Sequence, residues 1–293
     1  MKIADLHTHF YPEKISRDVS GWAAEYGESH WLSLVGSRPD GRESLQSFPT
    51  ISEFLKTMDD AGVERACMQS WYWQNPKAAA EANKMLAETV QKHSDRLFAY
   101  ACVNPASASF EQDLRRARDM GFQGVGELHD GVQKFDYASE NFGRFCEICA
   151  EYSFAVCLHL TDPGGRPYPN KIATNNSAAF EAARANQRVK FLFAHFGGGE
   201  VFKEGFIPPA NAFFDCAANT FLYGAEGFSR IGKSVLEKMR FGSDYSLRLY
   251  PKKFKTAEMK TFAEECASAV PEEFRESFFC GAMQTKSREV FYS

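Results

Sequence analysis

The segment that decides the fold runs from residue 141 to residue 160. It reads Asn141-Phe-Gly-Arg-Phe-Cys-Glu-Ile-Cys-Ala-Glu-Tyr152 and, after one serine, Phe154-Ala-Val-Cys-Leu-His-Leu160. The first part repeats apolar residues three and four positions apart, which predicts an amphipathic helix, and the second is a short apolar run typical of a buried strand. A helix that leads directly into a buried strand is the repeating unit of a parallel sheet.

The same unit recurs along the whole chain. We expect strands at residues 2–7, 65–70, 97–103, 124–128, 154–160, 190–195, 211–217 and 239–243. We expect helices at residues 50–61, 77–93, 110–120, 141–152, 177–185, 227–238, 256–269 and 272–290. Eight strands with connecting helices predict an α/β fold, a (β/α)8 TIM barrel, and a single domain that spans residues 1–293.

A long insertion, residues 11–49, separates the first strand from its helix. Connections of this length tend to be functional, and in a barrel this one opens on the face that carries active sites. The segment contains Trp22, Tyr26 and Trp31. It therefore either forms a lid or wall of a substrate pocket, or holds itself together by local aromatic packing.

Composition narrows the class of protein. The 293 residues carry a formal net charge of −4, with 25% charged and 44% hydrophobic residues. No basic stripe suggests a nucleic-acid partner, and no apolar run approaches the roughly 18 residues of a membrane span. We expect a soluble cytoplasmic protein; the sequence leaves the oligomeric state open, a homo-oligomer included.

The eight cysteines indicate a reducing compartment rather than disulfides. Four of them lie inside apolar runs, where free buried thiols are the simpler explanation. Cys146 and Cys149 share one face of a predicted helix, and no second pair follows at zinc spacing. We therefore expect no thiolate metal site.

Histidines and carboxylates gather where predicted strands end. In Asp5-Leu-His7-Thr-His9 the two imidazoles lie two positions apart on one strand, so both point to the same face. A single such pair is a weak signal, but the ends of other predicted strands carry the same chemistry: His159, His195, Glu127 and Asp244, with His129 two positions after Glu127. Because parallel strands of a barrel end on one face, these groups are expected to meet.

Imidazoles and carboxylates without thiolates suit Zn²⁺, Mn²⁺ or Fe²⁺. Such an ion lowers the pKa of a bound water from about 15.7 toward about 7. Asp244 then serves both as ligand and as proton acceptor, and an unligated His195 orients the water or polarises a carbonyl group.

These motifs also carry a family resemblance. His7-Thr-His9, His159, Ala194-His195-Phe-Gly-Gly-Gly199 and Gly242-Ser-Asp244 resemble the amidohydrolase superfamily. The most similar branch is the amidohydrolase-related (amidohydrolase 2) group, which includes the aminocarboxymuconate-semialdehyde decarboxylases. The resemblance implies a divalent metal, Zn²⁺ first, held by His7, His9, His159 and Asp244, with His195 as a catalytic neighbour.

Glu127 departs from that pattern. Many superfamily members place a carbamylated lysine on the fourth strand, whereas Glu127 resembles the bridging glutamate of TatD-type nucleases and some two-metal hydrolases. If Glu127 and His195 both bind metal, the centre holds two ions; otherwise it holds one.

Five residues are weaker candidates for substrate binding. Arg166 and Arg248 follow strands and either clamp a substrate carboxylate or remain solvated loop residues. Trp71 and Trp73 either line an aromatic pocket or pack against the insertion. His129 shares the face of Glu127.

Two functions remain in competition. The first is hydrolysis of a small lactone, amide or ester of a carboxylic acid by a metal-activated water. The second is metal-dependent, non-oxidative decarboxylation of an unsaturated or aromatic acid. A TatD-type nuclease and a catalytically inactive barrel are further alternatives; the acidic net charge argues against the first, and the complete set of metal-binding residues argues against the second.

Overall fold

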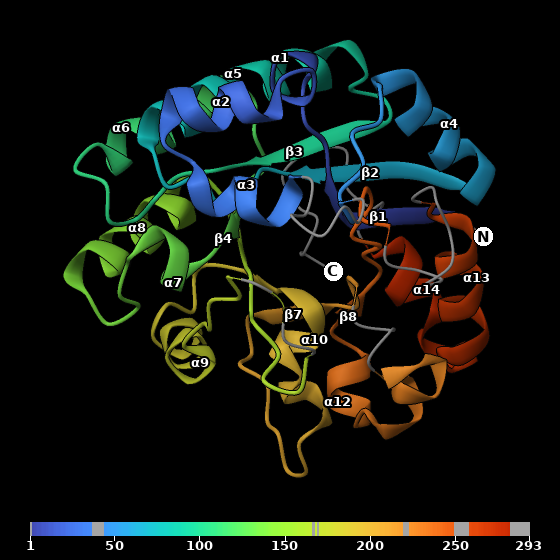
Figure 1. Ribbon diagram of the computed structural model, residues 1–293. Helices are drawn as coiled ribbons and strands as arrows, with labels where there is room; N and C mark the ends of the chain where they lie inside the picture. Colours follow the sequence, from blue (N-terminus) through green and yellow to red (C-terminus); the bar gives the residue numbers. More distant parts are fainter. Residues whose placement is uncertain are drawn as a thin grey trace.

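The strands of the protein form one parallel sheet in sequence order, β1 to β8 (Figure 1). The structure, a computed structural model, describes residues 2–36, 44–165, 168, 170–218, 223–248 and 258–281. The strands are β1 (Ile3–His9), β2 (Val63–Gln69), β3 (Leu97–Ala101), β4 (Gly124–Leu128), β5 (Ala155–Leu158), β6 (Phe191–Phe193), β7 (Ala212–Asp215) and β8 (Met239–Arg240).

Contacts between the first strand and the segment after the last bring the sheet close to a closed barrel. The backbone N–H of Leu6 donates to the carbonyl of Phe241 over 2.9 Å, and that of Asp244 donates to the carbonyl of His7 over 2.8 Å. The predicted (β/α)8 TIM barrel is confirmed, since all seven neighbouring strand pairs are parallel.

Helices between the strands cover the outside of the barrel (Figure 1). They are α4 (Ile51–Ala61), α5 (Pro76–Lys92), α6 (Phe110–Asp119), α8 (Glu140–Glu151), α9 (Asn176–Ala185), α12 (Lys233–Leu236), α13 (Lys260–Ala269) and α14 (Glu272–Cys280). Shorter elements follow individual strands: α7 (Asp130–Gln133) after β4, α10 (Ala194–Gly198) and the 3-10 turn η1 (Glu200–Phe202) after β6, and the 3-10 turn η2 (Ala225–Arg230) after β7. Capping side chains determine where two of these helices begin. Thr50 and Glu53 form a capping box at the N-terminus of α4, and Asn75 caps α5, which has Pro76 in its first turn.

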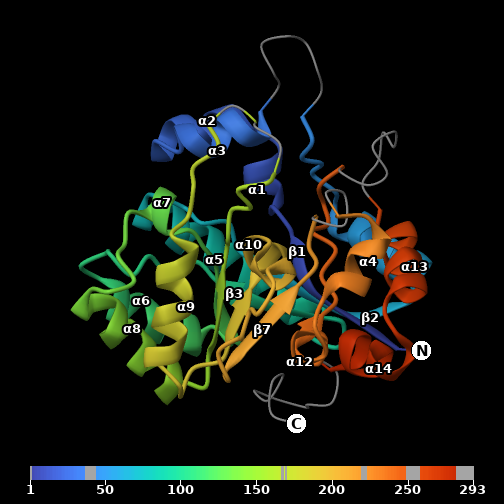
Figure 2. The same cartoon turned by 90° about the horizontal axis from the view of Figure 1, so that it is seen from below.

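The insertion after β1 is mostly helical. It contains α1 (Glu13–Ser16), α2 (Val19–Tyr26) and α3 (Ser29–Val35), and Figure 2 shows α2 and α3 above one end of the barrel. Trp22 and Trp31 are buried in a cluster of their own, with ring centroids 5.8 and 5.0 Å from that of Trp73. The aromatic residues therefore pack locally, which favours the packing alternative for Trp22 and Trp31.

Most predicted boundaries differ from the structure by a few residues, and two of the differences have a clear local cause. The helix predicted at 227–238 is split into η2 and α12, because Ile231 is extended and Gly232, a poor residue for a helix interior, caps the second piece. The strand predicted at 190–195 ends at Phe193, because His195 has a left-handed backbone, with φ of 59°. The helix predicted at 272–290 is described as α14 to Cys280; residues 282–290 lie outside the described residues.

Two features bear on the predictions from composition. All eight cysteines are free, and Cys146 and Cys149 are buried in α8, as predicted. Within the described part of the chain, no helix has both the length and the apolar character needed to cross a bilayer.

Candidate metal centre

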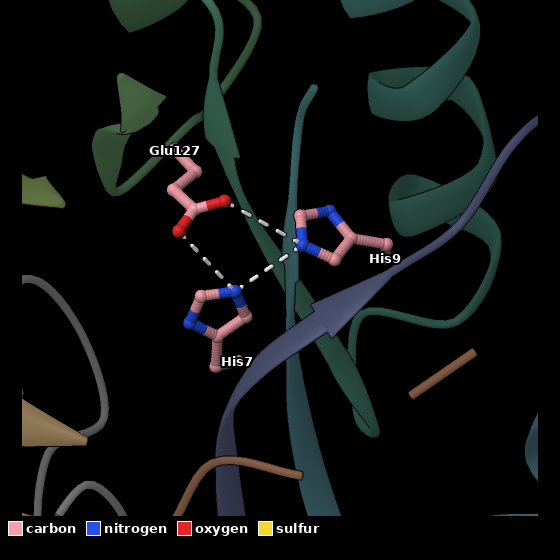
Figure 3. Close-up of side chains that lie close together, drawn as sticks. All are labelled: His7, His9 and Glu127. Carbon is pink, nitrogen blue, oxygen red and sulfur yellow. Dashed lines mark hydrogen bonds and ion pairs between the residues drawn. The ribbon is translucent and has the colours of Figure 1, made fainter. Parts of the chain in front are cut away.

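His7 and His9 occupy the carboxyl end of β1 and point to the same face. Their Nε2 atoms are 3.2 Å apart, and both imidazoles are buried. Figure 3 shows the two rings directed toward each other and toward Glu127 on β4. Two nitrogens bound to one Zn²⁺ at about 2.0–2.1 Å each lie roughly 3 Å apart. The separation therefore fits two ligands of one ion.

The Glu127 carboxylate lies within 3.8 Å of all four imidazoles of the cluster. One carboxylate oxygen, Oε1, lies 2.9 Å from His159 Nδ1, 3.2 Å from His195 Nε2 and 3.8 Å from His7 Nε2. The other, Oε2, lies 3.8 Å from His9 Nε2. A single carboxylate thus faces four imidazoles that come from β1 and from the ends of β5 and β6.

Asp244 approaches from the segment after β8. Its Oδ1 lies 3.5 Å from His9 Nε2 and 3.9 Å from His7 Nε2. The backbone holds this position, because the Asp244 N–H donates to the His7 carbonyl. On β1, Asp5 Oδ1 accepts from the backbone N–H groups of His7 and of Ser243, which ties β1 to the segment after β8.

His159 and His195 form the second side of the cluster. Nε2 of His195 lies 3.1 Å from Nδ1 of His159, and both contact Glu127. The described residues contain three groups that could hold a cation: His7–His9–Glu127 and Glu127–His159–His195, which share Glu127, and His7–Cys157–Asp215, which includes a thiol that the sequence did not predict at a metal site. The structure brings all the predicted ligands to one place, but it joins His159 to His195 rather than to the first group.

A left-handed turn presents His195. His195, Phe196 and the three glycines that follow all have positive φ. Space around two of these glycines is also tight: a Cβ on Gly198 would meet Asn176 Nδ2 at 2.4 Å, and one on Gly199 would meet the Tyr223 hydroxyl at 2.8 Å. The Gly-Gly-Gly sequence after His195 thus allows the chain to leave β6 sharply and leave the imidazole in the mouth.

Burial and neighbouring charges shift the pKa values of several groups in the cluster. Burial alone would lower the pKa of His7, but the carboxylates of Asp215 and Glu127 outweigh it and raise the pKa to about 10. Burial also opposes charge on His195, yet its hydrogen bond to Glu127 raises the pKa to about 9. Although burial raises the pKa of Glu127, His159 and His7 hold it well below its usual value. Burial lowers the pKa of His9. Such perturbed groups gathered in one site are typical of functional centres.

Sequence reasoning missed Asp215. This fully buried carboxylate ends β7 and lies with Oδ2 2.8 Å from Nδ1 of His7. The signal was available, since Asp215 lies near the end of the strand predicted at 211–217, where the same rule selected His159 and His195.

Two of the candidates for substrate binding, His129 and Trp71, lie beside imidazoles of the cluster. The imidazole of His129 stacks on that of His159, with ring centroids 4.9 Å apart. The ring centroids of Trp71 and His9 are 6.2 Å apart. Trp73 is 1% exposed and packs against Trp31 in the insertion cluster, which favours the packing alternative for this residue.

The structure places only one of the two candidate arginines. Arg248 follows the end of the barrel, where its backbone N–H donates to the Leu45 carbonyl. Arg166 lies outside the described residues.

Solved structures share this fold. The chain is similar to a dihydroxybenzoic acid decarboxylase from Polaromonas with bound manganese and the inhibitor 2-nitroresorcinol (15% identity, TM-score 0.63, covering 96% of this chain and 95% of that one). It is similar to 4-oxalomesaconate hydratase from Rhodopseudomonas palustris (15% identity, TM-score 0.66, 95% and 93% covered). It is also similar to a protein described as a probable 2-pyrone-4,6-dicarboxylic acid hydrolase from Acinetobacter baumannii (13% identity, TM-score 0.58, 96% and 97% covered).

At these identities the likeness establishes the fold. A comparison with curated proteins returns no match. The family comparison is decisive, because residues 4–282, nearly the whole chain and every member of the histidine and carboxylate cluster, match the amidohydrolase 2 family, described as Amidohydrolase. The chain belongs to this amidohydrolase family.

Proposed function

We propose that this protein is a metal-dependent hydrolase of a small carbonyl compound, a lactone, amide or ester of a carboxylic acid. The observation that carries the proposal is the convergence of four imidazoles on the carboxylate of Glu127, with Asp244 beside them, at the carboxyl ends of the strands. Active sites of barrels of this kind lie at that end. A purely structural cluster gains nothing from gathering there.

The donor set fits a divalent cation. His7, His9, His159 and Asp244 are the proposed ligands, with Glu127 positioned to join them, and these nitrogen and oxygen donors suit Zn²⁺, with Mn²⁺ and Fe²⁺ as alternatives. When bound, such an ion acidifies a water and polarises a carbonyl oxygen. The number of ions, one or two, depends on whether Glu127 and His195 both act as ligands.

The remaining chemistry belongs to side chains of this chain. Asp244 is the proposed proton acceptor, because it lies beside the histidine pair and its backbone is anchored to His7. It takes the proton from the attacking water and returns it to the leaving group. His195 Nε2 faces the same space beside Glu127, where it would orient the water or stabilise negative charge on the carbonyl oxygen.

The substrate is proposed to be small and to carry a carboxylate. Trp71 and His129 lie beside the imidazoles of His9 and His159 and would form an aromatic wall against an unsaturated or cyclic compound. Arg248, and Arg166 from the sequence alone, are the proposed partners of the carboxylate.

The same wall favours a second candidate, non-oxidative decarboxylation of an unsaturated or aromatic acid. Some proteins with this fold act on such acids, the Polaromonas decarboxylase among them. In that reaction the site residues would hold the acid and deliver a proton to the carbon that loses CO2, rather than activate a water.

One assay separates the two functions. Metal-loaded protein is presented with a panel of lactones and a panel of hydroxybenzoate-like acids, and proton release is recorded alongside CO2 release. Hydrolysis releases a proton from a lactone without CO2, whereas decarboxylation releases CO2 from the acid. The His9→Ala variant is the matched negative control. If the metal is fully bound and neither product forms with any member of either panel, both candidates are contradicted.

A further inference from the structure

Asp215 contacts two histidines of the cluster that come from two different strands. Its carboxylate is fully buried and uses both oxygens: Oδ2 lies 2.8 Å from Nδ1 of His7, and Oδ1 accepts from the backbone N–H groups of His195 over 2.9 Å and of Ala217 over 3.0 Å. We propose that Asp215 is a positioning residue, which fixes the ring of His7 and the turn of His195 so that both Nε2 atoms face the cation site. This inference rests on the proposed metal-dependent function.

The contact with His7 fixes which nitrogen carries a proton. With the Asp215 carboxylate as the acceptor of this hydrogen bond, Nδ1 of His7 is the donor. The lone pair available to a cation is then on Nε2, the atom that faces His9 and Glu127. A carboxylate behind a ligating imidazole both orients the ring and raises its basicity.

The contact with His195 holds the backbone in place. His195 and Phe196 adopt left-handed conformations that are costly for residues other than glycine. The Asp215 carboxylate binds the N–H of His195, and the Ala217 carbonyl accepts from Nδ1 of the same residue over 2.9 Å. Because a carbonyl only accepts, Nδ1 of His195 is also protonated, and Nε2 is directed to Glu127 and His159.

The thiol of Cys157 lies on the same side of His7 as Asp215. Cys157 lies close to His7 and Asp215. Burial raises the pKa of its thiol well above the usual value, which favours the neutral thiol in the metal-free protein. The 2.8 Å contact with Asp215 occupies Nδ1 of His7 and leaves Nε2 to face the group that contains His9 and Glu127.

The test compares Asp215→Asn with a matched control. Asp162→Asn also removes a buried carboxylate that follows a strand, but Asp162 accepts from the Tyr223 hydroxyl and lies outside all three candidate cation groups. Affinity for Zn²⁺ is measured by competition with a chromophoric chelator, and Co²⁺ absorption reports the coordination. Asp215→Asn is expected to lose about 10- to 100-fold in affinity and to change the Co²⁺ spectrum, whereas Asp162→Asn retains both.

A second measurement needs no variant. In wild-type protein loaded with Zn²⁺, ¹⁵N NMR of the histidine side chains is expected to show His7 protonated at Nδ1 and metal-bound at Nε2. Metal on Nδ1 of His7, or an Asp215→Asn variant that folds and binds Zn²⁺ as the wild type does, would overturn the inference. Wild-type protein that binds no divalent metal at all would instead contradict the proposed function.

Discussion

Replacing Glu127 with glutamine tests the charge at the centre of the cluster while changing its shape little. Oε1 of Glu127 lies 3.8 Å from His7 Nε2 and 3.2 Å from His195 Nε2, so a cation held by these imidazoles lies within a few ångströms of it. With Asp244 offsetting one charge of the dication, the remaining unit charge and the Glu127 carboxylate, about 4 Å apart, interact with about 4 kcal/mol at an effective dielectric constant of about 20. Since about 1.4 kcal/mol is a factor of ten, the loss approaches about 10³-fold in affinity.

The amide oxygen of glutamine keeps part of that interaction, so we expect Glu127→Gln to weaken Zn²⁺ binding by at least about 10²-fold. The assay is competition with a chromophoric chelator at fixed pH and ionic strength. Glu28→Gln is the control, because Glu28 is equally buried but accepts from the Asn75 backbone in the insertion. It should stay within about threefold of wild type, as distant sites usually do.

A Glu127→Gln variant that folds and binds Zn²⁺ within about threefold of wild type would refute the reasoning, since that result would place the cation away from this carboxylate.

Three further predictions concern protons, stability and metal removal. Burial lowers the pKa values of His7 and His195, but nearby carboxylates outweigh burial and raise these values to about 10 and about 9. At pH 8 the metal-free protein should therefore release protons when Zn²⁺ binds, and the affinity for Zn²⁺ should rise as the pH increases through these two pKa values. Calorimetry in two buffers of different ionisation enthalpy measures the proton release, and binding without proton release would contradict the prediction. Trp31→Ala should cost about 3–5 kcal/mol in denaturant unfolding because Trp31 is fully buried in the insertion cluster, and a cost below about 1 kcal/mol would show that the cluster is loosely packed. Chelation should lower Tm and abolish activity, with Zn²⁺ restoring both; full activity in demonstrably metal-free protein would exclude a metal-dependent reaction.

The barrel could be predicted because its repeating unit is local. Each apolar run between amphipathic segments is visible within about twenty residues, and the alternation along a strand places His7 and His9 on one face without any knowledge of their neighbours. The rule that parallel strands end on one face of the barrel then gathers His159, His195 and Asp244.

Features that depend on distant contacts could not be predicted in the same way. The role of Asp215 depends on His7, which is 208 positions away in the sequence. Trp73 follows a strand just as Trp71 does, and only the packing of the insertion separates a buried side chain from one at the mouth. The left-handed turn at His195 overrides the strand pattern before it, and its local signal is the run of glycines that follows.

The proposed function requires a divalent cation held by the Nε2 atoms of His7 and His9. The most direct test is anomalous diffraction from crystals of protein purified without added metal, with the His7→Ala variant analysed in parallel for metal content. In the wild type we expect an anomalous peak between these two nitrogens, next to Glu127, and we expect the variant to lose that metal. Wild-type crystals without a peak even after incubation with Zn²⁺ or Mn²⁺, or a variant with the metal content of the wild type, would contradict this expectation.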